Sequence, residues 1–83
     1  MAIGLLIMEL SLHKGTVELV SLTYGRINAF VERHQLGAEW FGDYAGMYFY
    51  VVLQEQTFRV NVTNLDPEKE DDGRVQIDAV ALR

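Results

Sequence analysis

The sequence predicts a single α+β domain in which one long amphipathic helix packs on a mainly antiparallel sheet of three or four strands. A helical apolar repeat in the first half of the chain and strand-like alternation in the second half indicate this class. The composition agrees, because 49% of the 83 residues are hydrophobic, 11% are aromatic and only one is proline. Such a chain forms one domain, residues 1–83, with a folded core rather than a disordered ensemble.

The N-terminal segment Met1–Leu10 is apolar and predicts the first strand. It has no basic region ahead of it, and its uninterrupted apolar stretch is too short for a signal peptide or a membrane span. The chain also has no cysteine, which excludes disulfides and thiolate metal sites and fits a reducing compartment. We therefore expect a cytoplasmic protein with no membrane partner.

The next segment, Val17 to Leu36, predicts the long helix, with Thr16 as N-cap and Gly37 as the C′ residue. Apolar side chains recur there at spacings of three and four and form one stripe that covers the sheet: Val17, Val20, Tyr24, Ile27 and Val31. Gly25 costs about 1 kcal/mol relative to alanine inside a helix, a cost that another backbone approaching there would offset.

A second apolar group on this helix, Leu19, Leu22 and Phe30, widens the apolar arc beyond what one sheet requires. The N-terminal segment, the aromatic loop or a partner protein would have to cover it. An alternative interpretation makes residues 17–31 a strand pair that turns at Gly25 and Arg26, which would give an all-β barrel.

Three strands are expected after the helix, in the overall order β-α-β-β-β with the strand neighbours left open. Residues 47–53 are apolar on both alternating faces, which predicts an interior strand that meets no bulk water on either side. Residues 58–63 alternate between apolar and polar side chains, as in a strand with one wet face, and 54–56 form the hairpin turn between the two. Residues 75–82 form the last strand.

Most of the net charge of −5 lies between residues 66 and 72, a segment whose own charge is −4. Its acidic side chains are Asp66, Glu68, Glu70, Asp71 and Asp72. The run Asp66-Pro67-Glu68 predicts the capped start of one helical turn that ends at Gly73, and the spacing does not match a calcium loop. Weak cation binding and an electrostatic contact with a basic partner are the functional alternatives.

No motif predicts catalysis, a metal site or a cofactor. Ser11 and Ser21 lack a nucleophile turn near His13 or His34, and the two histidines lack the spacing that places two metal ligands on one face. The glycines do not form a phosphate loop, and no basic residue lies between 36 and 56, so direct nucleic-acid binding is not expected.

The candidate binding surface is the aromatic-glycine segment, residues 37–50, because aromatic rings give large contact area at small entropy cost and glycine frees the backbone. The expected binding residues are Trp40, Phe41, Tyr44, Tyr48 and Tyr50, joined by Leu22 and Phe30 on the outer helix face. The structural alternative is that Phe41, Phe49 and Trp40 belong to the core.

We therefore expect a small acidic, non-enzymatic protein-interaction module that forms a homodimer and binds a protein partner of basic character. An inhibitor, an immunity-like protein or an accessory protein would fit by analogy of size and charge. The alternative is a small-molecule binding domain with a pocket between helix and sheet. That pocket would be lined by Tyr24, Tyr48, Tyr50 and Trp40, with Glu39 or Arg59 orienting the ligand.

Overall fold

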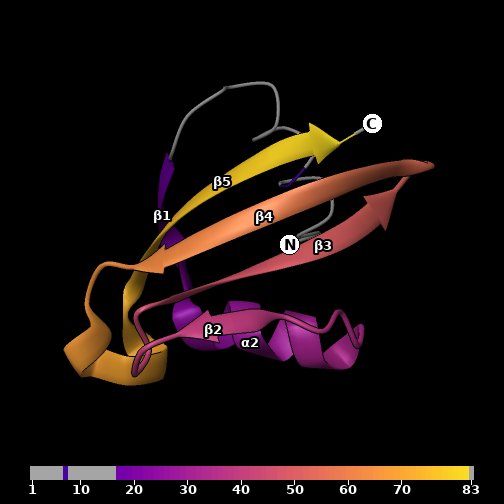
Figure 1. The fold of residues 1–83 in the computed structure, drawn as a ribbon. Helices are drawn as coiled ribbons and strands as arrows, with labels where there is room; N and C mark the ends of the chain where they lie inside the picture. Colours follow the sequence, from indigo (N-terminus) through magenta and orange to yellow (C-terminus); the bar gives the residue numbers. More distant parts are fainter. Residues whose placement is uncertain (1–6, 8–16, 83) are drawn as a thin grey trace.

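The computed structural model describes Ile7 and residues 17–82, and it confirms the α+β class (Figure 1). In the part of the chain that the structure describes, helix α2 (Tyr24–Arg33) packs against a five-stranded antiparallel sheet. The strands are β1 (Val17–Thr23), β2 (Glu39–Phe41), β3 (Gly46–Leu53), β4 (Gln56–Asn64) and β5 (Arg74–Leu82). A short 3₁₀ segment, η1 (Pro67–Asp72), connects β4 to β5.

The strand order is β1-β5-β4-β3-β2, and every neighbouring pair is antiparallel. Strands β2 to β5 follow one another as a meander, and β1 pairs with the last of them. The helix therefore connects the two edge strands of the sheet, β1 and β2, and runs beside β2 in Figure 1. This placement brings α2, β2 and η1 to the same end of the molecule.

The prediction of a helix from Val17 to Leu36 is wrong over its first third, because residues 17–23 form strand β1. Val17 lies opposite Ile77 and Leu19 lies opposite Val75 in the ladder with β5. The segment is rich in β-branched residues, which favour strands, and its ladder partner lies more than fifty residues away in the chain. The periodicity of neighbouring residues carries no information about so distant a partner. The helical spacing of the apolar residues therefore led to a wrong prediction for this segment.

Helix α2 begins after Thr23, whose extended backbone and side-chain oxygen form the N-cap and accept a hydrogen bond from the Arg26 N–H at 3.3 Å. The expected cap, Thr16, lies outside the described residues. Because residues 24–33 are helical, the all-β alternative with a turn at Gly25 and Arg26 is also wrong.

The helix ends in a Schellman motif, with Gln35 in the left-handed region at φ 53°. The Leu36 N–H donates to the Val31 carbonyl at 3.1 Å, which satisfies one of the last helical acceptors. The C′ residue is therefore Gln35 and not the expected Gly37.

Buried residues of α2, of the strands and Ile7 form one core cluster. Its buried apolar residues are Ile7, Leu22, Tyr24, Ile27, Val31, Ala38, Met47, Phe49, Val51, Phe58, Val60, Val62, Val75, Ile77 and Ala79. The alternation expected for residues 58–63 is confirmed, since Phe58, Val60 and Val62 are buried. In residues 75–82 it is confirmed only as far as Ala79, because Ala81 is exposed together with Val80. The turn at Gln54 and Glu55 is also confirmed, and both residues have positive φ, as in a type I′ hairpin.

Strand β3 is interior to the sheet, as expected, but it is not dry on both sides. Tyr50 and Val52 are exposed, with Val52 retaining 65% of its accessible surface. The apolar run arises because one face of β3 packs under the helix while the other carries apolar side chains on the open face of the sheet.

The strand expected at Met1–Leu10 lies outside the described residues, with one exception. Ile7 is in helical conformation and fully buried in the core cluster. Within the described part of the chain, neither helical segment has the length and apolarity needed to cross a membrane.

Candidate binding surfaces

The aromatic-glycine segment divides its rings between the two faces of the sheet. Side chains alternate along a strand, and Trp40 lies opposite the buried Met47, whereas Glu39 lies opposite Tyr48. Trp40 therefore points to the helix side, and Phe41 and Tyr48 share the open side. The predicted single surface is two surfaces, one on each face.

The open face carries a group that we call the outer patch: Phe41, Tyr48, Tyr50, Val52 and Val80. Phe41 is 53% exposed and its ring lies 5.7 Å from that of Tyr48, which in turn meets Tyr50 edge-on at 6.0 Å. The structure thus orders these rings by contact with one another while leaving apolar surface accessible, as at recognition surfaces.

Arg59 lies across the rings of the outer patch. Its guanidinium carbon is 4.2 Å from the Tyr48 ring centroid and 5.9 Å from that of Tyr50, distances at which cation–π attraction operates. Its Nε donates to the Asn61 side chain at 3.1 Å, and Asn61 donates to Asp78 at 3.2 Å. A line of polar contacts across β4 and β5 therefore fixes the cation on the aromatic surface.

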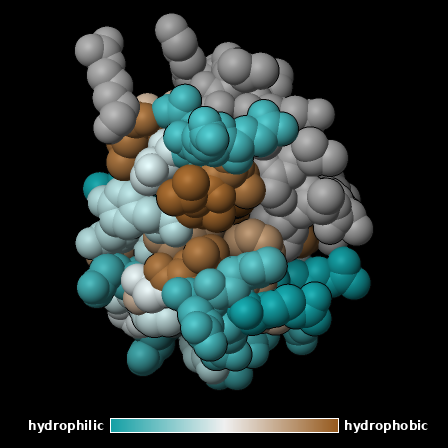
Figure 2. Space-filling model, turned by 90° about the vertical axis from the view of Figure 1, so that its right-hand side faces the viewer, coloured by the Kyte–Doolittle hydropathy of each residue, from teal (hydrophilic) through white to brown (hydrophobic). Residues whose placement is uncertain are grey.

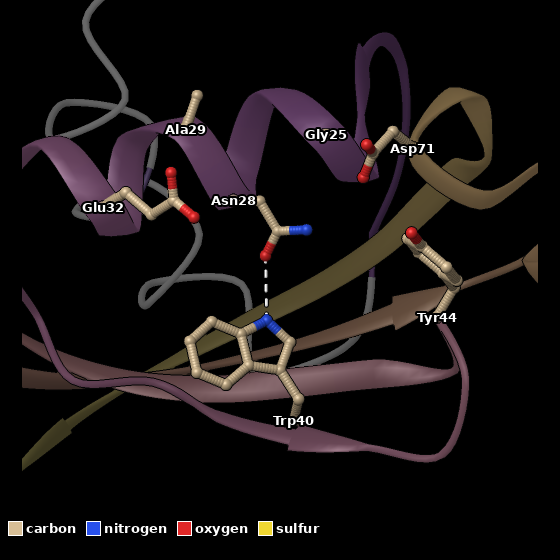
Figure 3. A pocket seen from close by; sticks show the side chains of 7 residues that line it. All are labelled: Gly25, Asn28, Ala29, Glu32, Trp40, Tyr44 and Asp71. Atoms are coloured by element: carbon tan, nitrogen blue, oxygen red, sulfur yellow. Dashed lines mark hydrogen bonds between the residues drawn. The ribbon is translucent and has the colours of Figure 1, made fainter.

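The helix side holds a different arrangement, which we call the helix-side pocket and which Figure 3 shows. It has a volume of about 350 Å³ and is lined by Gly25, Asn28, Ala29, Glu32, Trp40, Tyr44 and Asp71. The Trp40 Nε1–H donates to the Asn28 side-chain oxygen at 2.9 Å, which fixes the indole against the helix. In Figure 3, Glu32 lies at one end of the pocket, and Asp71 lies with Tyr44 at the other.

Tyr24 lies in the core and contacts Tyr44, one of the residues that line the pocket. Its buried hydroxyl donates to the Gly46 carbonyl at 3.0 Å, and its ring meets Tyr44 edge-on at 6.2 Å. Burial, and then the negative charge of Asp71, raise the pKa of Tyr24 above its ordinary value of 10.0. Tyr44 itself has a positive φ of 57°, a conformation that is strained for a side chain of this size.

Gly25 and η1 approach each other closely at the same place. A Cβ at Gly25 would lie 2.7 Å from the Asp71 Cβ. Another segment of the chain therefore packs closely against this glycine, as expected from the sequence. Glu70, the preceding residue, is held at φ 55° and ψ −120°, a region normally left to glycine. The backbone is therefore strained where it delivers Asp71 to the first turn of α2, a position that the helix dipole favours for a carboxylate.

The acidic segment forms the turn expected of it, but Asp66 differs from the other four carboxylates. It is largely shielded and bonds Arg74 through the backbone N–H at 3.0 Å and through Nε at 2.8 Å. Hydrogen bonds from Arg74 hold the pKa of Asp66 far below its usual range. Asp66 is thus structural, whereas Glu68, Glu70, Asp71 and Asp72 are exposed.

Three of the expected binding residues are not freely exposed: Tyr48, half-buried within the outer patch, and the two residues expected on the outer helix face. Leu22 is only 3% exposed, because β1 turns it into the core. Phe30 is half-buried and packs against Phe49 and His34. Neither residue therefore belongs to an outer helix face.

The alternative pocket lined by four aromatic residues is wrong in its composition. Only Trp40 lines the observed pocket, since Tyr24 lies in the core and Tyr48 and Tyr50 lie on the opposite face with Arg59. Sequence reasoning missed Asn28, Glu32 and Ala29. They lie three, four and seven positions after Gly25, on a helix face separate from the apolar stripe, and this spacing is the signal that could have identified them.

Apolar surface is also visible at the end of the molecule where the β3–β4 hairpin turns and α2 ends. In Figure 2 it lies between hydrophilic side chains at the top and bottom of the view.

Among the described residues, no group of three or more histidine, aspartate or glutamate side chains could hold a metal ion.

Searches against protein-family models, curated proteins and solved structures gave no match to this chain.

Proposed function

We propose that this protein is a non-enzymatic protein-interaction module that forms a homodimer through the outer patch. The observation that carries the proposal is the exposure of Phe41, Tyr50, Val52 and Val80 around an ordered cation–π group on an open sheet face. Tyrosine and arginine are enriched among residues that dominate binding energy, and a contiguous exposed apolar group of this kind marks interaction sites.

The register of the strands concentrates these side chains. Tyr50 lies opposite Arg59, and Arg59 lies opposite Val80, so one row across β3, β4 and β5 carries an aromatic, a cationic and an aliphatic side chain. Because the rings contact one another and Arg59 is hydrogen-bonded to Asn61, little side-chain freedom remains to be lost on association.

A second copy of the chain is a suitable occupant of this face. A two-fold interface must be self-complementary, and the open face offers apolar side chains together with the positive Arg59 and the negative Asp78 and Glu39. Two open sheets pack face to face at about 10 Å with interdigitating side chains. Association would also add buried apolar area to a domain of only 83 residues.

The experiment that tests this proposal measures solution mass against concentration by analytical ultracentrifugation. We expect a mass that rises toward twice the chain mass of 9.5 kDa, and Tyr50→Lys should prevent the rise because it adds a second cation beside Arg59. The matched control is Gln54→Lys, which places the same charge in the nearby hairpin turn.

Circular dichroism and thermal melting would establish that both variants fold. A wild-type protein that stays at 9.5 kDa at high concentration would refute the homodimer. Equal loss of association in Tyr50→Lys and Gln54→Lys would instead show that general charge, and not the outer patch, controls assembly.

A further inference from the structure

The helix-side pocket lies on the opposite side of the sheet from the outer patch and has a chemistry of its own. Asn28 and Ala29 lie three and four positions after Gly25, and Glu32 lies four and three positions after them, so these helix residues share one face and form one wall. Trp40 from β2, Tyr44 from the β2–β3 turn and Asp71 from η1 complete it (Figure 3).

The lining favours a cation. Two aromatic side chains, Trp40 and Tyr44, and two carboxylates, Glu32 and Asp71, face the space, and none of the described lining residues is a lysine or an arginine. The indole N–H is already engaged by Asn28, so the ring itself is what Trp40 offers. In the described part of the chain, neither carboxylate has a hydrogen-bond or ion-pair partner. Aromatic rings and uncompensated carboxylates both attract positive charge.

The pocket is held in shape before any ligand arrives. The 2.9 Å hydrogen bond to Asn28 orients Trp40, and the edge contact with Tyr24 supports Tyr44. The close approach of η1 to Gly25 fixes Asp71. Strain at Tyr44 and at Glu70, both at positive φ, accompanies this geometry and is of the kind found at binding sites.

The volume and the donor set define the class of ligand. A space of about 350 Å³ is at the small end of binding pockets and suits one side chain rather than a large molecule. Two carboxylates without a third ligand do not make a site for a hard divalent cation, which takes six or more oxygens. A guanidinium or an ammonium group instead combines ring contact with charge-assisted hydrogen bonds.

The neighbouring edge strand points to a protein as the source of that group. Strand β2 lies at the end of the sheet order, so one side of its backbone faces away from β3 at the edge of the described sheet. An extended peptide can bond to such an edge while a side chain enters an adjacent pocket. We propose that the helix-side pocket receives an arginine or lysine side chain from an extended segment of a partner protein.

The experiment uses the wild-type chain and N-acetyl-arginine amide as probe, with N-acetyl-citrulline amide as the neutral control of nearly the same shape. Trp40 is the only tryptophan in the chain, so its fluorescence reports the pocket directly. We expect a saturable change with the arginine probe, with a dissociation constant on the order of 1–10 mM, and none with the citrulline probe.

Charge-to-amide variants locate the binding. Glu32→Gln and Asp71→Asn should each weaken arginine binding roughly three- to fivefold. Glu68→Gln removes the same charge from an exposed position of η1 outside the pocket and should leave binding within the error. A peptide with one arginine in an extended segment should bind more tightly than the free probe, and its lysine counterpart should also bind.

Equal binding of citrulline and arginine, or equal weakening by Glu32→Gln and Glu68→Gln, would overturn the proposal, as would a peptide that binds no better than the free probe. If Asp71→Asn disturbs folding, Glu32→Gln alone decides the role of charge. Tyr50→Lys, designed to disrupt the outer patch, should still bind arginine, and Glu32→Gln should still associate, so the failure of either proposal is recognised separately.

Discussion

The substitution Gly25→Ala sets local helix propensity against tertiary packing. In an unobstructed helix, alanine would stabilise the protein by about 1 kcal/mol relative to glycine. Here the new Cβ would lie 2.7 Å from the Asp71 Cβ and 3.1 Å from the Asp71 carbonyl oxygen. Relief requires η1 to move by roughly 1 Å to reach ordinary carbon–carbon contact.

Segment η1 is not free to make that move. The Asn64 side chain donates to the Glu70 carbonyl at 3.0 Å, and the Lys69 N–H donates to the Asp66 carbonyl at 2.9 Å. Overpacking against such a fixed neighbour costs about 1–3 kcal/mol. The cost exceeds the propensity gain, so we expect a net loss of about 1 kcal/mol and a fall in Tm of roughly 4–8 °C.

Urea unfolding and thermal melting would measure this loss. Ala29→Gly, at an exposed position of the same helix, calibrates propensity and should cost about 1 kcal/mol. Combining Gly25→Ala with Asp71→Gly removes the closest contact and should show a favourable coupling of about 1 kcal/mol. If Gly25→Ala alone stabilises the protein by the full propensity difference, η1 does not pack against Gly25, and Asp71 does not line the pocket as described.

Three further predictions concern Tyr24 and the contacts that anchor η1, on the side of the helix-side pocket. Tyr24→Phe leaves the Gly46 carbonyl without its donor and should cost about 1–2 kcal/mol in urea unfolding at pH 8. Because the pKa of Tyr24 is raised above 10.0, its contribution is complete below pH 10 and is lost as the pH rises through the folded value, so the variant should lose less stability above pH 10 than the wild type does. Asp66→Asn should melt at a lower temperature than the wild type at pH 7, and its melting temperature should fall less steeply on acidification. The reason is that the pKa of Asp66 is depressed in the folded protein. Its contribution to stability is therefore present above about pH 3.8 and is lost as the pH falls toward the folded pKa. Gly73→Ala should cost about 3 kcal/mol, because a Cβ there would overlap the Asn64 Oδ1 and lie 2.7 Å from the Asp66 carbonyl oxygen, and a melting temperature close to that of the wild type would contradict this packing.

The fold class and the second half of the chain could be predicted because their signals are local. Alternation of apolar and polar residues in β4 and β5 follows from one face packing in the core, and Pro67 at the start of a turn ending in Gly73 is a signal of the same short range. The helical stripe from Tyr24 to Val31 is likewise a property of consecutive residues.

The candidate site was harder to predict, because contacts between distant segments form it. The sequence indicated that the aromatic-glycine segment carries exposed rings, and four of its aromatic residues, Trp40, Phe41, Tyr44 and Tyr50, are exposed. It did not indicate that Trp40 faces Asn28 while Phe41 faces Tyr48, since that depends on the register of β2 against β3. Leu22 was misplaced because the segment containing it pairs with β5.

By itself, the sequence determined which residues are apolar, where the chain must turn, and that its acidic charge is concentrated in one segment. The tertiary structure alone decided that residues 17–23 extend beside β5, that the rings divide between two faces, and that Asp71 reaches the first turn of α2. The physical reason is range: propensity and periodicity act over a few neighbouring residues, whereas strand pairing and close packing join residues tens of positions apart.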